Sequence, residues 1–373
     1  MPGGRMLDLM RRRTTAVLAA STLLGAGAVV AAASTAARLK GLDAPAGFAG
    51  ARLIVHGTAA GRITLTRSLD SLLPGTYAIT SRSSRAVIGP VIEDAPRRSP
   101  DTVVRRLERV DEGELAPGDT VRLTPQLHRG DPHSALGIGY TDVLIPGERG
   151  ELPAWCVPGP RDTWVIALHG LGSTRELPLN VLPVLHRMQF PVLLPDYPAE
   201  GLGAAEWPEA DAAVRYAVSY GARRVILYGW SVGGAMAVHA ATRSPLRERV
   251  AGLVLDSPVL DPAATVRALA ARRGVPWPLH SLAVRAARDG LRPGSGGPPA
   301  ARLARPDGSP VPVLIFHGPD DGIAPFGASR ELAEQHPETV TLHSVAGAEH
   351  AAVWNADPAG YEEQLGRFLM PLM

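Results

Sequence analysis

Cysteine, lysine and asparagine are nearly absent from this chain of 373 residues. The single cysteine, Cys156, excludes an intramolecular disulfide and a thiolate metal cluster. Lysine occurs only at Lys40 and asparagine only at Asn180 and Asn355, whereas alanine, glycine, proline and arginine are abundant. We interpret this bias as that of a GC-rich bacterial genome. The 40 glycines and 35 prolines therefore indicate turns between apolar strands rather than disorder.

Neither sign of charge dominates the chain. The 38 lysine and arginine residues nearly balance the 36 aspartate and glutamate residues, and the formal net charge is +2. This balance argues against the basic footprint of a nucleic-acid-binding protein. No glycine-rich phosphate loop and no metal-ligand spacing of histidine, cysteine and carboxylates occur in the sequence. We expect neither a cofactor nor a metal, and the sequence leaves the oligomeric state open.

An uncharged apolar run lies near the N-terminus. Residues 14–37 are rich in alanine, valine and leucine and directly follow three arginines, residues 11–13. A run of this length can span a bilayer as a helix, and it also resembles a secretory signal peptide. Because it is longer than a usual signal-peptide core, residues 1–40 are predicted to be a single-pass anchor in the cell membrane. The alternative is secretion after cleavage, and in both cases the rest of the chain lies outside the cytoplasm.

The remainder of the chain divides into two regions. Residues 43–134 contain short alternating segments bounded by glycine, proline or serine, which predicts a small β-rich region of unknown role. In residues 135–373 apolar strands alternate with helices, which predicts an α/β fold with a mostly parallel central sheet. Residues 257–310 interrupt this alternation and form a candidate helical lid. The expected strands of the second region are 140–145, 152–157, 164–168, 191–194, 225–228, 253–255, 313–316 and 340–342.

The stretch VILYGWSVGG, residues 225–234, places one serine between a predicted strand and a predicted helix. The pattern G-x-S-x-G is weak by itself, but this setting is that of a nucleophile elbow, whose strained turn requires small neighbours. Ser231 is therefore the candidate nucleophile. Glycines also surround Leu171 after an earlier strand, so we predict an oxyanion hole from the backbone N–H groups of Leu171 and Val232.

A catalytic serine needs a base, and the base needs an acid that orients it. Both kinds of residue follow Ser231 in loops after predicted strands: first the pair Asp320 and Asp321, then His350. Asp256, at the end of another predicted strand, is an alternative acid. The carboxyl ends of strands are where a doubly wound sheet places its sites, which favours all of these candidates.

At this point a family resemblance is clear. From about Gly139 to the end, the chain resembles the α/β-hydrolase superfamily. Its motifs HGLGSTRE, GWSVGG, LDSP and HGPDDGIAP are similar to those of serine aminopeptidase-like and prolyl-oligopeptidase-like hydrolases, including membrane-anchored bacterial members. The family's acid loop, H-G-x-x-D, maps onto Asp321 rather than Asp320, and its histidine loop onto His350. The resemblance implies a metal-free acyl-transfer hydrolase with Ser231, His350 and Asp321 as its triad.

The resulting hypothesis is an extracytoplasmic serine hydrolase that cleaves carboxylic esters through an acyl-enzyme. The alternatives that use the same triad are an aminopeptidase, another peptidase or an acyltransferase, so the substrate is a small acyl compound or a peptide. An alternative of another class is an inactive hydrolase-fold binding module of the cell envelope. Such a module usually lacks a triad residue or the elbow glycines, and here none is missing.

Overall fold

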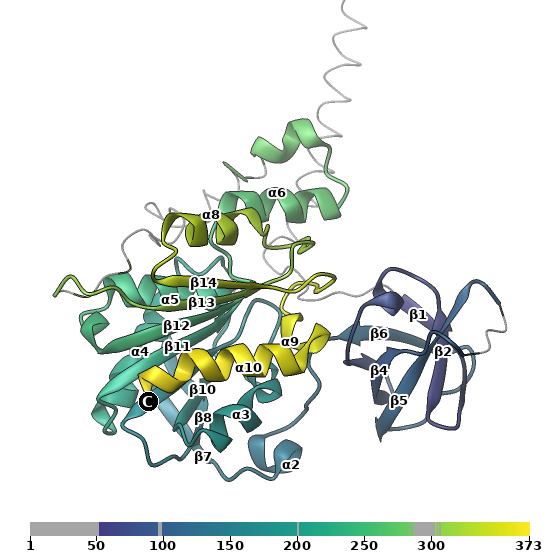
Figure 1. Ribbon diagram of the computed structural model, residues 1–373, viewed down its shortest axis with the longest axis horizontal. Helices are drawn as coiled ribbons and strands as arrows, with labels where there is room; N and C mark the ends of the chain where they lie inside the picture. Colours follow the sequence, from purple (N-terminus) through teal and green to yellow (C-terminus); the bar gives the residue numbers. More distant parts are fainter. Residues whose placement is uncertain are drawn as a thin grey trace, which may run out of the picture.

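The computed structural model describes residues 52–373 apart from 96–98, 200, 283, 286–302, 304 and 306. The predicted anchor or signal peptide, residues 1–40, lies outside these residues. Within the described part of the chain, no helix is long and apolar enough to cross a membrane. Figure 1 shows a β-barrel beside a larger α/β unit, which runs from β7 to the C-terminus.

Six antiparallel strands form the closed barrel, in the order β1-β2-β5-β4-β3-β6. Buried and exposed side chains alternate along strands such as β1 and β6, which gives the barrel its core. In β1, Leu53 and Val55 are buried in this core while Arg52 and Ile54 are exposed. The pairing of β1 with β6 closes the barrel. The β-rich region that the sequence predicts is confirmed. Its elements are β1 Arg52–Ala59, β2 Arg62–Thr66, η1 Asp70–Leu72, β3 Tyr77–Thr80, β4 Arg85–Val91, β5 Thr102–Glu112 and β6 Thr120–Thr124.

An eight-stranded sheet forms the centre of the α/β unit, in the order β14-β13-β12-β11-β9-β10-β8-β7. The strands from β14 to β10 in this order are parallel, whereas β8 and β7 are antiparallel additions at one edge. The predicted mostly parallel sheet is confirmed. Its strands are β7 Thr141–Gly147, β8 Gly150–Val157, β9 Thr163–Leu168, β10 Val192–Pro195, β11 Arg224–Trp230, β12 Val250–Asp256, β13 Val313–His317 and β14 Val340–Ser344.

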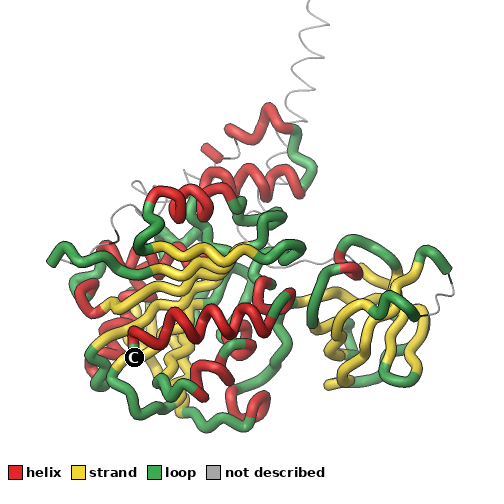
Figure 2. The backbone as a smooth tube through the Cα atoms, in the orientation of Figure 1, coloured by secondary structure: helices red, strands yellow, loops and turns green. Residues whose placement is uncertain are grey.

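Helices cover both faces of this sheet (Figures 1 and 2). The helices α4, α5 and α8 pack into one apolar core, and α3 and α10 pack into the other. The central strands are therefore buried on both faces, which explains their almost continuous apolar runs. The helices are α2 Pro132–Leu136, η2 Leu177–Asn180, α3 Leu182–Arg187, α4 Trp207–Ser219, α5 Val232–Arg243, η3 Arg247–Arg249, α6 Pro262–Arg272, η4 Trp277–Leu279, α8 Gly327–Gln335, α9 Val353–Ala356, α10 Pro358–Leu369 and η6 Met370–Leu372.

The candidate lid, residues 257–310, is described only in part. Helix α6 and the short η4 lie in this segment, whereas residues 286–302 lie outside the described part of the chain. The side chains of Val266 and Ala270 attach α6 to the same apolar core as α4 and α5. A role for this segment as a lid stays a prediction.

Candidate active site

Ser231 lies on the turn between β11 and α5. Its backbone has φ 54° and ψ −116°, a left-handed conformation that is strained for any residue except glycine. The Ser231 N–H donates to the carbonyl of Asp256 at 2.8 Å, which ties the turn to the neighbouring strand. Helix α5, Val232–Arg243, begins directly after the serine. The serine is thus held at a helix N-terminus with 5% of its surface exposed.

Close backbone contacts explain the small residues of this turn. A Cβ atom on Gly229 would lie 2.3 Å from the carbonyl oxygen of Gly233, and one on Gly233 would lie 2.1 Å from that of Leu168. Real Cβ atoms do not approach backbone this closely, so a side chain at either position would force the elbow apart. The G-x-S-x-G pattern is therefore a steric requirement of the turn.

His350 joins the serine to a carboxylate. Its Nε2 atom lies 2.8 Å from Ser231 Oγ, and its Nδ1 atom lies 2.8 Å from Asp321 Oδ2. An ionised carboxylate can only accept hydrogen bonds, so the proton of the neutral imidazole lies on Nδ1. The Nε2 lone pair then faces the serine hydroxyl, which donates to it. This is the tautomer that a general base requires.

Asp321 accepts four hydrogen bonds. Its Oδ1 atom receives the backbone N–H groups of Ile323 at 2.8 Å and Ala324 at 2.9 Å, while Oδ2 receives His350 and, at 3.2 Å, Nε2 of His317. Burial alone would raise the pKa of Asp321, but the charges and hydrogen bonds of His350 and His317 hold it well below its usual range. The acid is therefore ionised and fixed in orientation.

The alternative acids lie elsewhere. The Asp256 carboxylate is buried and accepts hydrogen bonds from the hydroxyls of Tyr361 and Ser257, each at 2.9 Å. Burial raises the pKa of Asp256 to about 6. Asp320 is exposed to solvent. Of the three candidate acids, only Asp321 contacts the His350 imidazole.

The predicted oxyanion-hole residues flank the serine. Val232 is the first residue of α5, so its N–H cannot bond within the helix. The turn that carries Leu171 packs directly on the nucleophile, because a Cβ atom on Gly170 would lie 2.8 Å from Ser231 Cβ. Both side chains are buried. Their role as donors to an oxyanion stays a prediction.

One residue beside the triad was missed by the sequence reasoning. Ser257 has φ 48°, and its hydroxyl accepts the N–H of Ala351 at 2.9 Å while donating to Asp256. Ala351, which follows His350, also has a left-handed φ of 55°. Ser257 therefore supports the histidine loop from the sheet side. The only signal in the sequence is its place next to Asp256 in the motif LDSP.

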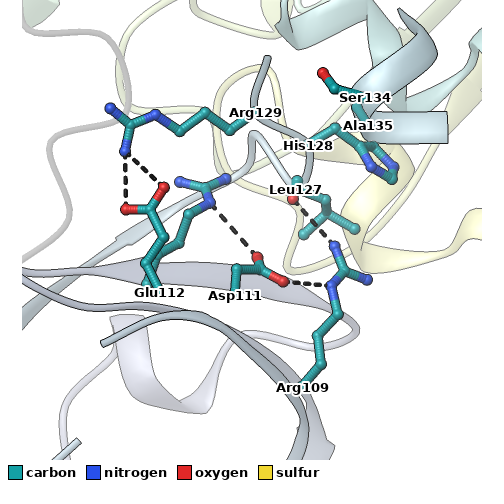
Figure 3. Close-up of a pocket in the computed structure, with 9 residues that line it drawn as sticks. Arg109, Asp111, Glu112, Leu127, His128, Arg129, Ser134 and Ala135 are labelled. Carbon is teal, nitrogen blue, oxygen red and sulfur yellow. Dashed lines mark hydrogen bonds and ion pairs between the residues drawn. The ribbon is translucent and has the colours of Figure 1, made fainter. Parts of the chain in front are cut away.

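A separate cavity of about 280 Å³ lies where the barrel meets the segment before α2 (Figure 3). None of its lining residues is a predicted site residue. Its charges are paired: Arg109 contacts Asp111 at 2.6 Å, and Arg129 contacts Glu112 at 3.1 Å. Burial, followed by nearby arginine charges, lowers the pKa of His128 to about 4, so this histidine is neutral. We interpret the cavity as an ion-paired junction.

Among the described residues, no three or more histidine, cysteine, aspartate or glutamate side chains lie together in an arrangement that could hold a metal ion. The hydrogen-bonded groups of Ser231, His350 and Asp321 have the chemistry of a nucleophile, a base and an acid.

The two regions of the chain match different family models. Residues 163–281 match the family model described as alpha/beta hydrolase fold, and residues 54–124 match a domain of unknown function (DUF8805). The chain is 34% identical over 100 residues to a pimeloyl-[acyl-carrier protein] methyl ester esterase of Edwardsiella ictaluri, covering 26% of this chain and only 37% of that protein. It is 29% identical over 223 residues to the protein of that name in Chromobacterium violaceum, covering 50% of this chain and 87% of that protein.

A solved structure extends the likeness to the whole α/β unit. The esterase Pf2001 of Pyrococcus furiosus superimposes with a TM-score of 0.53 at 21% sequence identity, covering 66% of this chain and 95% of that one. At this identity the match supports the fold alone. Taken with the family model over residues 163–281, it shows that the α/β unit has the α/β-hydrolase fold.

Proposed function

We propose that the protein hydrolyses carboxylic esters, with Ser231 as nucleophile, His350 as general base and Asp321 as the acid that orients it. One observation carries this proposal: hydrogen bonds of 2.8 Å join Asp321 to His350 and His350 to Ser231. The esterase names of the relatives and of the structural neighbour support an ester as the acyl substrate.

The chemistry follows from this line of hydrogen bonds. Ser231 Oγ attacks the acyl carbonyl carbon while His350 Nε2 takes the serine proton, and the ionised Asp321 stabilises the resulting imidazolium. The predicted oxyanion hole, the N–H groups of Leu171 and Val232, would stabilise the negative charge that develops on the carbonyl oxygen. His350 then gives its proton to the departing alcohol, leaving an acyl-enzyme. Water deprotonated by His350 releases the carboxylic acid and restores the serine.

The test is labelling of the full-length chain by a fluorophosphonate, followed by hydrolysis of p-nitrophenyl esters of increasing acyl length. We expect the parent to be labelled and to cleave short esters, and Ser231→Ala to do neither. The matched control is Ser219→Ala, because Ser219 is an exposed serine at the end of α4. Retention of labelling in Ser231→Ala, or a folded parent that is never labelled, would contradict the proposal. Cleavage of peptide anilides but not esters would favour a peptidase.

We further propose that the catalytic unit acts outside the cytoplasm. The support is the sequence alone: arginines at 11–13 followed by the uncharged residues 14–37, all outside the described part of the chain. The test is protease treatment of intact spheroplasts that produce a C-terminally tagged chain. Digestion of the tag without lysis is expected, and protection of the tag until lysis would refute this placement.

A further inference from the structure

The barrel packs directly against the loop that carries the catalytic histidine. Ala352, two residues after His350, is completely buried and belongs to the hydrophobic core of the barrel, together with residues such as Leu53 and Val121. The chain of the α/β unit therefore enters the barrel core immediately after its general base. Figure 1 shows the start of α9 at this junction.

Asn355 fastens this segment to the barrel. Its side-chain Nδ2 donates to the backbone carbonyls of Thr76 and Pro125, both at 2.8 Å. The backbone carbonyl of Asn355 accepts the N–H of Thr76 at 2.9 Å. The contact is so close that a Cβ atom on Gly75 would lie 1.9 Å from the Asn355 carbonyl oxygen. Asn355 is completely buried, so these bonds are not exchanged for water.

The barrel side of this contact is itself held rigidly. The fully buried guanidinium of Arg105 donates to the carbonyls of Ser71, Leu73 and Gly75, and also to Gly89 on β4. Hydrogen bonds to charged donors are stronger than neutral ones, so the segment that leads to Thr76 cannot shift independently of the strands. The barrel thus presents a fixed surface to the histidine loop.

The other side of the loop is held by the sheet. The Ala351 N–H donates to Ser257, whose hydroxyl donates to the buried Asp256. Ala351 keeps a left-handed backbone, which persists only when the surrounding structure imposes it. The loop carrying His350 is therefore fixed between two supports, one in each structural unit.

We propose that the barrel is a positioning domain for the catalytic centre and that Asn355 is a positioning residue for His350. This inference rests on the proposed function, because it assigns His350 the role of general base. A base displaced by about 1 Å can cost on the order of 100-fold in rate. The barrel would set the distance between His350 Nε2 and Ser231 Oγ, and would not itself touch the reacting atoms.

The experiment compares two pairs of variants of the full-length chain. Asn355→Leu removes the donor of the histidine-loop contact, and Asn180→Leu is its control: Asn180 Nδ2 donates to the same Pro125 carbonyl at 2.9 Å, but from η2. Gly75→Ala places a methyl group against Asn355. Its control is Gly118→Ala, since Gly118 has a similar left-handed φ of 96° in the barrel with open space around it.

We expect Asn355→Leu and Gly75→Ala to lower kcat and the fluorophosphonate labelling rate about 10-fold to 100-fold, with KM unchanged within about twofold. The controls should keep the parental kcat. The proposal is overturned if a folded Asn355→Leu keeps the parental kcat, or if the controls lose as much. If Asn355→Leu does not fold, the glycine pair decides.

A second readout separates this inference from the proposed function. The proton on His350 Nδ1, bonded to Asp321, gives a low-field NMR signal that His350→Ala identifies. Loss or shift of this signal in Asn355→Leu and Gly75→Ala but not in the controls supports the positioning role, even if the parent is never labelled. An unchanged signal in the folded variants overturns it.

Discussion

Replacement of Asp321 by asparagine is the sharpest test of the hydrogen-bonded site. The Oδ1 position receives two backbone N–H groups, from Ile323 and Ala324, so the amide oxygen of an asparagine must occupy it. The amide NH₂ group then faces Nδ1 of His350, which has to accept rather than donate. The proton of His350 moves to Nε2, beside the serine hydroxyl, and the lone pair needed for proton abstraction is lost.

The loss of kcat in Asp321→Asn should be large. The corresponding change in a serine protease triad lowers kcat about 10⁴-fold through the same wrong tautomer, which corresponds to about 5 kcal/mol of transition-state stabilisation. We expect a similar loss in Asp321→Asn, with KM nearly unchanged and the fold preserved. The assay is steady-state hydrolysis of a p-nitrophenyl ester at neutral pH, with circular dichroism to verify folding.

The control for this prediction is the neighbouring carboxylate. Asp320 is exposed, so Asp320→Asn should leave kcat within about twofold of the parent. The reasoning is refuted if Asp321→Asn retains more than about a tenth of the parental kcat, or if both variants lose activity equally. Either result would mean that the 2.8 Å contact to His350 does not orient the base.

Three further predictions concern stability. Burial raises the pKa of Asp256 to about 6, so the protonated carboxyl contributes to the free energy of unfolding fully below about pH 4, and this contribution is lost as the pH rises through 6. Asp256→Asn should remove this decrease from a plot of Tm against pH. An unchanged plot would contradict the assignment. Ser231→Gly should relieve the strain of the φ of 54° and raise the free energy of unfolding, measured by urea denaturation, by about 1–3 kcal/mol. The same variant should have no activity. A free energy of unfolding below that of the parent would contradict the strain at Ser231. Arg105→Met should lower the free energy of unfolding by about 3 kcal/mol or more, because buried carbonyls lose their donor. Its control, Arg106→Met, replaces an exposed arginine and should change the free energy of unfolding by less than about 0.5 kcal/mol.

The strands of the α/β unit could be predicted because their chemistry is local. Each is a short apolar run bounded by turn residues, and β11 and β13 begin and end within two residues of the expected positions. The elbow could be predicted for the same reason, since Gly229, Ser231 and Gly233 are neighbours in the chain. The prediction of Ser231 and His350 as partners rested on chain order, and the structure places their side chains in contact.

The choice of acid could not be made from the residues alone. Asp256 and Asp321 both follow strands of the same sheet, and only side-chain contacts separate them. One of the two hydroxyls that donate to Asp256 belongs to Tyr361, 105 residues later in the chain. Sequence reasoning has no access to a contact of this range, so the alternatives remained open until the family motif was considered.

The junction between barrel and α/β unit was equally inaccessible. Asn355 and Thr76 are separated by 279 residues, and neither belongs to a motif. One signal was present in the composition. The chain has only two asparagines, Asn180 and Asn355, and both donate to the carbonyl of Pro125 at this junction. The rarity of asparagine draws attention to these two residues, but nothing in the sequence indicated that they share the Pro125 carbonyl as acceptor.

The order of synthesis gives the junction another meaning. All pairings of the barrel lie within β1 to β6, so the barrel can close on the ribosome as soon as β6 has emerged. Ser231 emerges later, 119 residues before the His350 imidazole that it contacts in the folded chain. A nascent chain therefore carries Ser231 without His350 and has no activated serine. On the proposed function, the serine would be activated only after the segment around Asn355 has docked on the barrel.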